Sequence, residues 1–286
     1  MEVLKQTSNR YELFKKPEFS AVVKVENALL QGVRNYFNKE GFTEVVVPHM
    51  TKATGACENI NTLFDVNYFG EKSYLVQTGQ LYLESLVPTL NKVFCIGPSF
   101  RAEPDVDDRH LTEFTLVELE MQCDLNELIE RIEKLFMSMI SSVKENKKDL
   151  NVLGADISKL NDLKPPFKRV TYTEAVETLN KLNFEVSWGD DLKSRHEKAL
   201  CRHLGNKPFF ITHYPEKIKF FNMRTNKEDT KIVNSTDFIL PDSGEAVGAA
   251  EREYEHSILY QKLKNSTMMQ QLEKLGGKID DFEWYL

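Results

Sequence analysis

Two short runs of apolar and β-branched residues, joined by a charged loop, constrain the fold more than any other feature of this chain. They cover Lys92–Ile96 and Thr112–Gln122, and the loop segment Glu103–His110 holds four acidic residues and one proline. Successive side chains of a strand point to opposite faces, so Phe114 and Leu116 would share one face of the second run. The pattern predicts a β-hairpin.

The other apolar runs predict strands that mostly follow one another along the chain, with helices placed between the groups. Neighbouring strands of this kind favour antiparallel pairing over a doubly wound parallel sheet. We therefore expect an α+β fold with a mixed, largely antiparallel sheet flanked by helices. Strands are predicted at Phe42–Val47, as a hairpin within Leu63–Val76, and at Pro208–Thr212, Lys219–Arg224, Thr236–Leu240 and Ala246–Ala250, and helices at Glu18–Glu40, Gln80–Leu90, Leu125–Lys144, Thr173–Leu182 and Glu251–Leu275.

Size and composition fit a folded globular domain. The chain has 286 residues, 41% of them hydrophobic and 28% charged, which allows a buried core and excludes disordered, collagen-like and coiled-coil chains. The four scattered cysteines predict reduced thiols. The polar stretch Lys144–Pro166, which ends in a Pro-Pro pair, is the predicted linker or insertion.

Charge and hydropathy argue against two classes of partner. The net charge of −7 argues against broad nucleic-acid binding, although a local basic patch stays open. Apolar runs fall short of the roughly 18 residues that a membrane span needs. The first residues show no signal-peptide core, so we expect a cytoplasmic protein without a membrane partner.

The predicted hairpin carries side chains suited to a nucleotide. Arg101 and Arg109 offer guanidinium groups that match phosphate oxygens, and His110 is adjacent. Glu103 can accept an adenine amino proton, and Phe114 offers a face for stacking. A solvated, charged surface hairpin would account for the same residues taken singly.

A second set of candidates lies near the end of the chain. The segment Gly244–Glu253 is rich in small residues, which let a ligand approach the backbone closely. Glu245 within it, with Asp237 before it, has the carboxylate chemistry that magnesium prefers. Arg252 could bind a polar side chain. Tight strand packing explains the small residues equally well.

Taken together and in this order, these segments resemble the signature of class II aminoacyl-tRNA synthetases, in the asparaginyl/aspartyl branch. Gly41–Pro48, which alone predicts only the end of a strand, resembles the dimer-forming motif 1. Phe100–Glu120 resembles motif 2, and the run FRAE…RHLTEFT…ELEM matches that motif specifically. The resemblance runs from Asn9 to Leu286 and implies an antiparallel sheet flanked by helices. Further stretches agree at Gln77–Glu84, Thr171–Ala175, Trp188–Leu192, His196, Glu197 and His213–Pro215.

The resemblance implies a reaction and a role for each matching residue. The α-carboxylate of an amino acid would attack the α-phosphorus of ATP, giving an aminoacyl-adenylate and pyrophosphate, while the protein positions the reactants and neutralises charge. The implied ATP ligands are Arg101 as the catalytic contact to the α-phosphate, Glu103 at the adenine amino group, Arg109 and His110 at the outer phosphates, Leu111, Phe114 under adenine, and Glu245. The implied Mg²⁺ ligands are Glu245 and Asp237, and the implied amino-acid ligands are Gln80, Glu84 and Arg252.

Asparagine is the favoured substrate, with aspartate left open. Aspartyl enzymes have a lysine after the Gln-Leu-Tyr signature, whereas Leu83 and Glu84 follow here, and an acidic acceptor suits an amide and repels a carboxylate. Against this, Gly248–Arg252 reads GAAER where asparaginyl enzymes usually have Gly-Gly-Ser-Gln-Arg, and Asn222 replaces a usual tyrosine. The Glu-Arg-Glu run resembles an archaeal asparagine synthetase, which activates aspartate for amidation by ammonia.

Two family features are missing from the sequence. No anticodon-binding domain precedes the signature, and no motif 3 follows Arg252, so we expect one catalytic domain over residues 1–286 with its C-terminal part truncated. The alternatives are a biosynthetic paralog and a non-catalytic regulatory one. The resemblance implies as partners ATP, asparagine or aspartate, the acceptor end of tRNA and a second copy of the chain in a homodimer.

Overall fold

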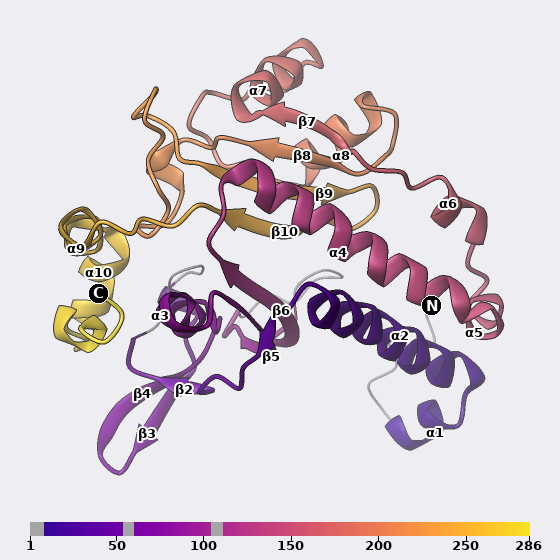
Figure 1. Ribbon diagram of the computed structural model, residues 1–286, viewed down its shortest axis with the longest axis horizontal. Helices are drawn as coiled ribbons and strands as arrows, with labels where there is room; N and C mark the ends of the chain where they lie inside the picture. The colour runs from indigo at the N-terminus through magenta and orange to yellow at the C-terminus, as the bar shows by residue number, and fades with distance from the viewer. Residues whose placement is uncertain (1–8, 54–59, 104–110) are drawn as a thin grey trace. The chain divides into compact units, whose positions relative to one another are not determined.

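The computed structural model describes residues 9–53, 60–103 and 111–286, which divide into two compact units (Figure 1). The smaller unit comprises the described part of Met1–Gly41 together with Ile129–Phe167. The larger unit comprises Phe42–Leu128 and Lys168–Leu286. Within the described ranges, every helix is too short or too polar to cross a membrane.

The smaller unit is helical, and a glycine sets its closest helix contact. A side-chain carbon at Gly32 would lie 2.6 Å from Met139 Cα, so the two helix backbones touch there. The Ser138 hydroxyl donates to the Gly32 carbonyl at 2.7 Å across the same contact. The helices are α1 (Arg10–Phe14), α2 (Pro17–Lys39), most of α4 (Leu125–Glu145), α5 (Lys147–Val152) and α6 (Ile157–Asn161).

The stretch Lys144–Pro166, predicted as a linker or insertion, contains helices. It contains α5 and α6, and both Asp149 and Leu150 are buried. The backbone N–H of Phe167, directly after it, donates to the buried Glu133 carboxylate at 2.8 Å. Helices this short have too few apolar positions to show a period, so composition alone suggested a linker.

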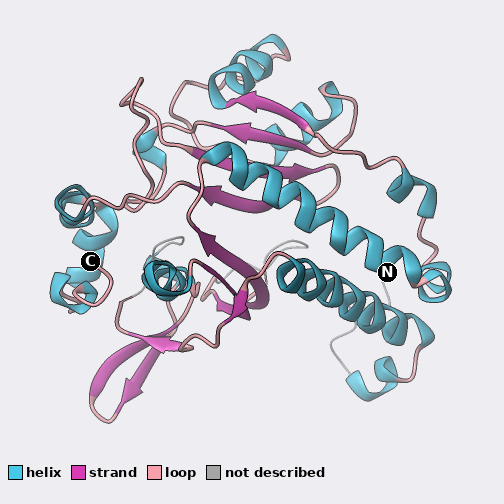
Figure 2. Ribbon diagram, viewed as in Figure 1, coloured by secondary structure: helices cyan, strands magenta, loops and turns pink. Residues whose placement is uncertain are grey.

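Three sheets form the strand framework of the larger unit (Figure 2). Strands β1 and β5, and strands β7 and β8, pair in parallel, and the other described strand pairs are antiparallel. The α+β prediction with a mixed, largely antiparallel sheet is therefore confirmed. The first sheet has the order β1-β5-β6 and consists of β1 (Thr43–Glu44), β5 (Lys92–Phe100) and β6 (Glu113–Met121). The second has the order β10-β9-β8-β7 and consists of β7 (Lys168–Thr171), β8 (Phe209–Thr212), β9 (Ser235–Leu240) and β10 (Gly244–Ala250). The third has the order β2-β4-β3 and consists of β2 (Met50–Thr51), β3 (Asp65–Tyr68) and β4 (Glu71–Leu75).

The predicted hairpin is present and longer than expected. Strands β5 and β6 pair continuously from Lys92↔Met121 to Phe100↔Glu113. The prediction ended the first strand at Ile96 because Gly97 and Pro98 follow. Pro98 is tolerated because β1 pairs only with Val93 and Phe94, so β5 has no second partner at the proline.

Helix α3 (Gln80–Leu90) matches its predicted bounds, and it is held from two sides. It ends at Asn91, whose φ of 65° stops the helix. Leu83 packs with Val93 and Cys95 of β5, whereas Leu81 packs into a separate cluster with the last helices of the chain. The position of α3 thus depends on both the hairpin and the chain end.

The C-terminal segment differs from its prediction. One helix was expected over Glu251–Leu275, but α9 (His256–Asn265) and α10 (Thr267–Lys274) are separate. Ser266 is extended, with ψ of 146°, and its side chain accepts from the Met269 N–H to cap α10. A local cap thus outweighs a continuous apolar pattern.

The segment Lys219–Arg224 is not the predicted strand. It is a loop after the 3-10 turn η3 (Glu216–Ile218), with one isolated bridge between Met223 and Arg252. Phe221 and Met223 are nevertheless buried, which explains the strand-like apolar pattern.

Two helices cover the four-stranded sheet. Helix α7 (Tyr172–Lys181) begins with a capping box between Thr171 and Glu174. Helix α8 (Ser194–His203), which the sequence analysis did not predict, buries Leu200 and Cys201 in the same core cluster as α7. Strand β7 was also not predicted.

We expect Leu83→Ala to destabilise the larger unit by about 2–5 kcal/mol, the usual cost of a buried leucine cavity. Leu83 is 0% exposed. Leu90→Ala on the same helix, where the side chain is 39% exposed, is the matched control. Urea unfolding at equilibrium measures both, and equal losses would contradict the packing described for α3.

Candidate functional site

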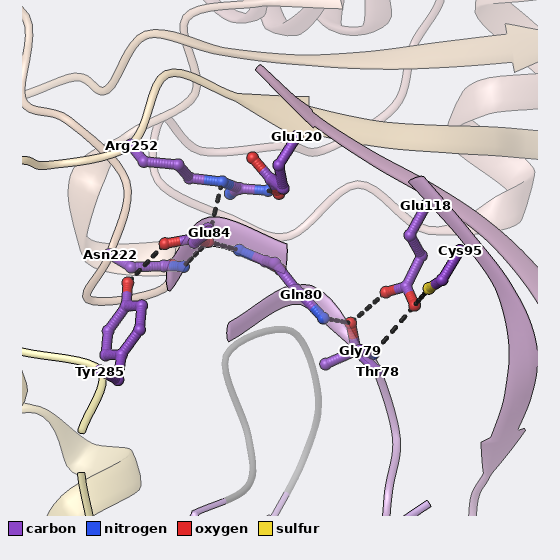
Figure 3. A network of polar contacts seen from close by, with 10 residues as sticks. All are labelled: Thr78, Gly79, Gln80, Glu84, Cys95, Glu118, Glu120, Asn222, Arg252 and Tyr285. Atoms are coloured by element: carbon purple, nitrogen blue, oxygen red, sulfur yellow. Dashed lines mark hydrogen bonds and ion pairs between the residues drawn. The ribbon is translucent and has the colours of Figure 1, made fainter. Parts of the chain in front are cut away.

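A cluster of polar side chains meets at α3, with Glu84 at its centre (Figure 3). Gln80 and Glu84 are four residues apart and therefore share one helix face. Glu84 Oε1 accepts hydrogen bonds from Gln80 Nε2 and, at 2.9 Å, from Asn222 Nδ2, and lies 3.2 Å from Arg252 Nε. Its other oxygen, Oε2, accepts from the Tyr285 hydroxyl.

Arg252 joins two carboxylates on different elements. It follows β10, and its Nη2 lies 3.2 Å from Oε1 of Glu120 on β6, while Nε faces Glu84. All three side chains are largely buried. Burial raises the pKa of Glu120 to about 8; the charge of Arg252 opposes this rise and the Glu84 carboxylate adds to it. Glu120 is therefore mainly protonated at neutral pH, and Arg252 balances the charge of Glu84.

This arrangement places donors beside acceptors in a poorly solvated position. Arg252 supplies N–H donors, and ionised Glu84 supplies only acceptors. A carboxamide has the complementary pair, one carbonyl oxygen and one NH₂ group. The cluster can thus bind a neutral amide without leaving a charge unpaired.

Glu118 of β6 anchors the turn that starts α3. Its Oε1 accepts from the Thr78 hydroxyl, and its Oε2 accepts from the Gly79 N–H at 2.8 Å and from the Cys95 thiol at 3.5 Å. Burial, followed by the charge of Glu118, raises the pKa of Cys95, so the thiol stays protonated and donates. A side-chain carbon at Gly79 would lie only 2.8 Å from Val47 Cγ2, so this turn requires glycine.

The motif 2 candidates are brought together only in part. Arg101 directly follows β5, and its guanidinium lies 4.8 Å from the centre of the Phe114 ring on β6. Its backbone N–H donates to the Thr112 carbonyl at 2.8 Å, which closes this end of the hairpin. Glu103 is half-buried in the loop that follows, and Leu111 is exposed. Arg109 and His110 lie outside the described residues.

The two predicted magnesium ligands converge over Gly248. A side-chain carbon there would lie 3.0 Å from Glu245 Oε1 and 3.7 Å from Asp237 Oδ1, so the glycine lets both carboxylates lie close to the backbone. Lys219 Nζ lies 3.0 and 3.2 Å from the two Asp237 oxygens. Burial acts to lower the pKa of Lys219, but the Asp237 and Glu245 carboxylates outweigh it and keep the ammonium charged.

The carboxylates of Glu245 and Asp237 offer hard oxygen atoms of the kind that Mg²⁺ prefers. Among residues 9–53, 60–103 and 111–286, no group of three or more potential ligands is arranged to hold a metal ion alone. The further ligands of such an ion would therefore be water or phosphate oxygens of a nucleotide.

Glu120, Lys219, Asn222 and Tyr285 belong to these clusters and were not predicted as site residues. Glu120 shares a strand face with Glu118, so alternation along β6 could have indicated it. Lys219 and Asn222 lie in the segment that was predicted as a strand. Tyr285 is 201 positions from Glu84, and no local pattern connects them.

Glu120→Gln should flatten the pH dependence of stability. The folded chain holds the Glu120 proton up to a pH of about 8, whereas the unfolded chain releases it near 4.5. Between these values the folded state binds more protons, so the free energy of unfolding falls as pH rises. The variant removes up to about 1.4 kcal/mol of this fall per pH unit. Urea titrations from pH 5 to 8 measure the slope, and an unchanged slope would contradict a buried, protonated Glu120.

The same substitution at exposed Glu113, also on β6, is the matched control and should leave the slope as it is.

The chain resembles proteins of one family along its whole length. Residues 3–286 match the family of tRNA synthetases class II (D, K and N). The asparagine--tRNA ligase of Desulforamulus reducens is 36% identical over 280 residues, which are 97% of this chain and 62% of the relative. That of Pyrococcus furiosus is 37% identical over 273 residues, 94% of this chain and 60% of the relative. The chain thus spans about three fifths of the length of these curated relatives.

Solved structures of asparaginyl-tRNA synthetases are similar to this chain as well. Asparaginyl-tRNA synthetase from Pyrococcus horikoshii, complexed with asparaginyl-adenylate, superposes with a TM-score of 0.87 at 35% identity, over 96% of this chain and 62% of that one. The Entamoeba histolytica asparaginyl-tRNA synthetase, also with asparaginyl-adenylate, gives 0.77 at 30% identity, over 92% and 57%. With a family match over nearly every residue and an α+β fold shared with these enzymes, the chain belongs to the class II tRNA synthetases.

Proposed function

We propose that this chain activates asparagine with ATP to form asparaginyl-adenylate, and that the acceptor end of a tRNA then receives the asparaginyl group. The observation that carries the proposal is the buried Glu84–Arg252 pair beside a largely protonated Glu120. Relatives named asparagine--tRNA ligase and a similar structure that holds asparaginyl-adenylate support it.

The polar cluster accounts for the choice of amino acid. Arg252 donates to the side-chain carbonyl of asparagine, and Glu84 accepts from its NH₂ group. Aspartate would instead place a second carboxylate beside Glu84 in a poorly solvated position, where like charges repel strongly. This disfavours activation of aspartate for amidation, the second candidate.

The nucleotide would occupy the β5–β6 hairpin. Phe114 offers a face to adenine, Glu103 accepts from its amino group, and Arg101 binds the α-phosphate. Arg109, His110 and Leu111 complete the proposed ATP ligands. Glu245 and Asp237 would hold Mg²⁺, which supplies neutralisation of phosphate charge.

The reaction itself needs positioning more than covalent catalysis. One α-carboxylate oxygen of asparagine forms a bond to the α-phosphorus, and the bond from that phosphorus to the β-phosphate bridging oxygen breaks, so pyrophosphate leaves with the electron pair. Arg101 stabilises the negative charge on the α-phosphoryl oxygens as the bonds change.

ATP–pyrophosphate exchange with asparagine, aspartate or no amino acid tests the proposal. We expect exchange with asparagine, and little with aspartate. Exchange with aspartate alone would favour the biosynthetic alternative, and no exchange with either would contradict activation by this chain.

In the same assay, Glu84→Lys should lower kcat/KM for asparagine by at least about 100-fold and raise it for aspartate, because the acceptor becomes a cation. Glu177→Lys, at an exposed position on α7, is the charge-matched control. An unchanged preference would exclude Glu84 from side-chain recognition.

The segment that resembles motif 1 supports a proposed homodimer. We expect the protein in the cytoplasm. Val46 is 92% exposed between β1 and β2, whereas its neighbour Val47 is buried against α3 and β5. Such exposure of an aliphatic residue in the segment that resembles motif 1 fits an interface between copies.

Val46→Asp should therefore give monomers by light scattering, because the interface would bury a charge. Phe69→Asp, equally exposed at the tip of the β3–β4 hairpin, should leave the dimer intact. A dimer that survives in the Val46 variant would place the interface elsewhere.

A further inference from the structure

Asn222 is buried beside Glu84 in the polar cluster, and backbone contacts hold it in place. Asn222 is 0% exposed. Its carbonyl oxygen accepts from the Glu253 N–H at 2.8 Å, and the next residue, Met223, forms a bridge with Arg252. The segments that carry Asn222 and Arg252 therefore run side by side, and both side chains reach Glu84 (Figure 3).

The chemistry of Glu84 fixes which way the Asn222 amide faces. An ionised carboxylate only accepts hydrogen bonds, so the Asn222 nitrogen, and not its oxygen, faces Glu84 Oε1 at 2.9 Å. The Oδ1 atom of Asn222 is then left on the other side of the amide. It is buried and has no hydrogen-bond partner among the described residues.

A buried carbonyl oxygen without a donor destabilises the folded state, because its hydrogen bonds to water are lost and not replaced. Neighbouring polar side chains donate to carboxylates. Tyr285 and Gln80 donate to Glu84, and Arg252 faces Glu84 and Glu120. A bound ligand with an N–H group would satisfy Oδ1. The side-chain amide of asparagine has two N–H hydrogens. One can be donated to Glu84, which leaves the other for Oδ1 of Asn222.

We propose that Asn222 is a specificity-determining residue, whose Oδ1 accepts one N–H of the substrate's side-chain amide while Glu84 accepts the other. This inference rests on the proposed function and adds a substrate contact to it. Two acceptors then face the amide nitrogen. A carboxylate oxygen in that place would have no donor from either residue, so Asn222 strengthens discrimination against aspartate.

Binding of two ligands to the whole chain, measured by calorimetry, tests the contact. L-Asparagine carries the NH₂ group, and the β-methyl ester of L-aspartate keeps the carbonyl but has no side-chain N–H. In Asn222→Leu, which has nearly the same shape, the Kd for asparagine should rise about tenfold or more, as loss of such a contact implies. The Kd for the ester should change less than about twofold, so the ester-to-asparagine ratio of Kd falls.

The control is Asn234→Leu, because the Asn234 amide also donates to a glutamate, Glu251, at 2.8 Å. It should leave the ligand ratio unchanged. If Asn222→Leu does not fold, Asn222→Ser is measured in the same way, because its shorter side chain no longer places an acceptor at the position of Oδ1.

Equal loss of both ligands, or an unchanged Kd for asparagine, would overturn the role of Asn222 and leave the proposed function standing. A wild-type chain that neither binds asparagine nor catalyses exchange would overturn both.

Discussion

The contacts of Arg252 with Glu84 and Glu120 are the interaction on which the rest of the site depends. One guanidinium, placed after β10, faces Glu84 on α3 and Glu120 on β6, so it ties three elements together in a buried position. Removing one partner of such a group leaves a buried charge without compensation, which costs several kcal/mol. The cluster is kept nearly neutral because burial holds the Glu120 proton. Charge balance, and not only shape, thus favours a neutral side chain as ligand.

The surrounding contacts hold α3 in position beside the Arg252 guanidinium. Glu118 fixes the turn before the helix, and Leu83 packs its middle against β5. From the other side, Trp284 stacks on Tyr82 at 4.5 Å between ring centres. The helix that is proposed to bind the amino acid is therefore held by β5 and β6, the two strands of the hairpin that is proposed to bind ATP. This common framework would position two substrates for one displacement without a covalent intermediate.

Local patterns predicted the elements that carry their own signals. The bounds of α3 and the pairing of β5 with β6 were confirmed, because strand alternation, turn residues and helix stops act over a few residues. Predictions failed where packing or a single cap decided the outcome. Ser266 divides one predicted helix in two, and the buried Phe221 gave a loop the composition of a strand. The roles of Arg101 and Glu245 at the site stay predictions, as do those of Arg109 and His110.

By itself, the sequence determined the α+β class, the membership of the synthetase family that its motifs resemble, and the residue types Gln80, Glu84 and Arg252 that suit an amide. Only the tertiary structure decided that Asn222 and Tyr285 meet at Glu84, from 138 and 201 positions away. The reason is physical: short-range patterns report neighbours on one strand or helix, whereas contacts between distant segments depend on how loops and helices pack. Buried hydrogen-bond partners are chosen at that last step, when each polar group must find a donor or acceptor.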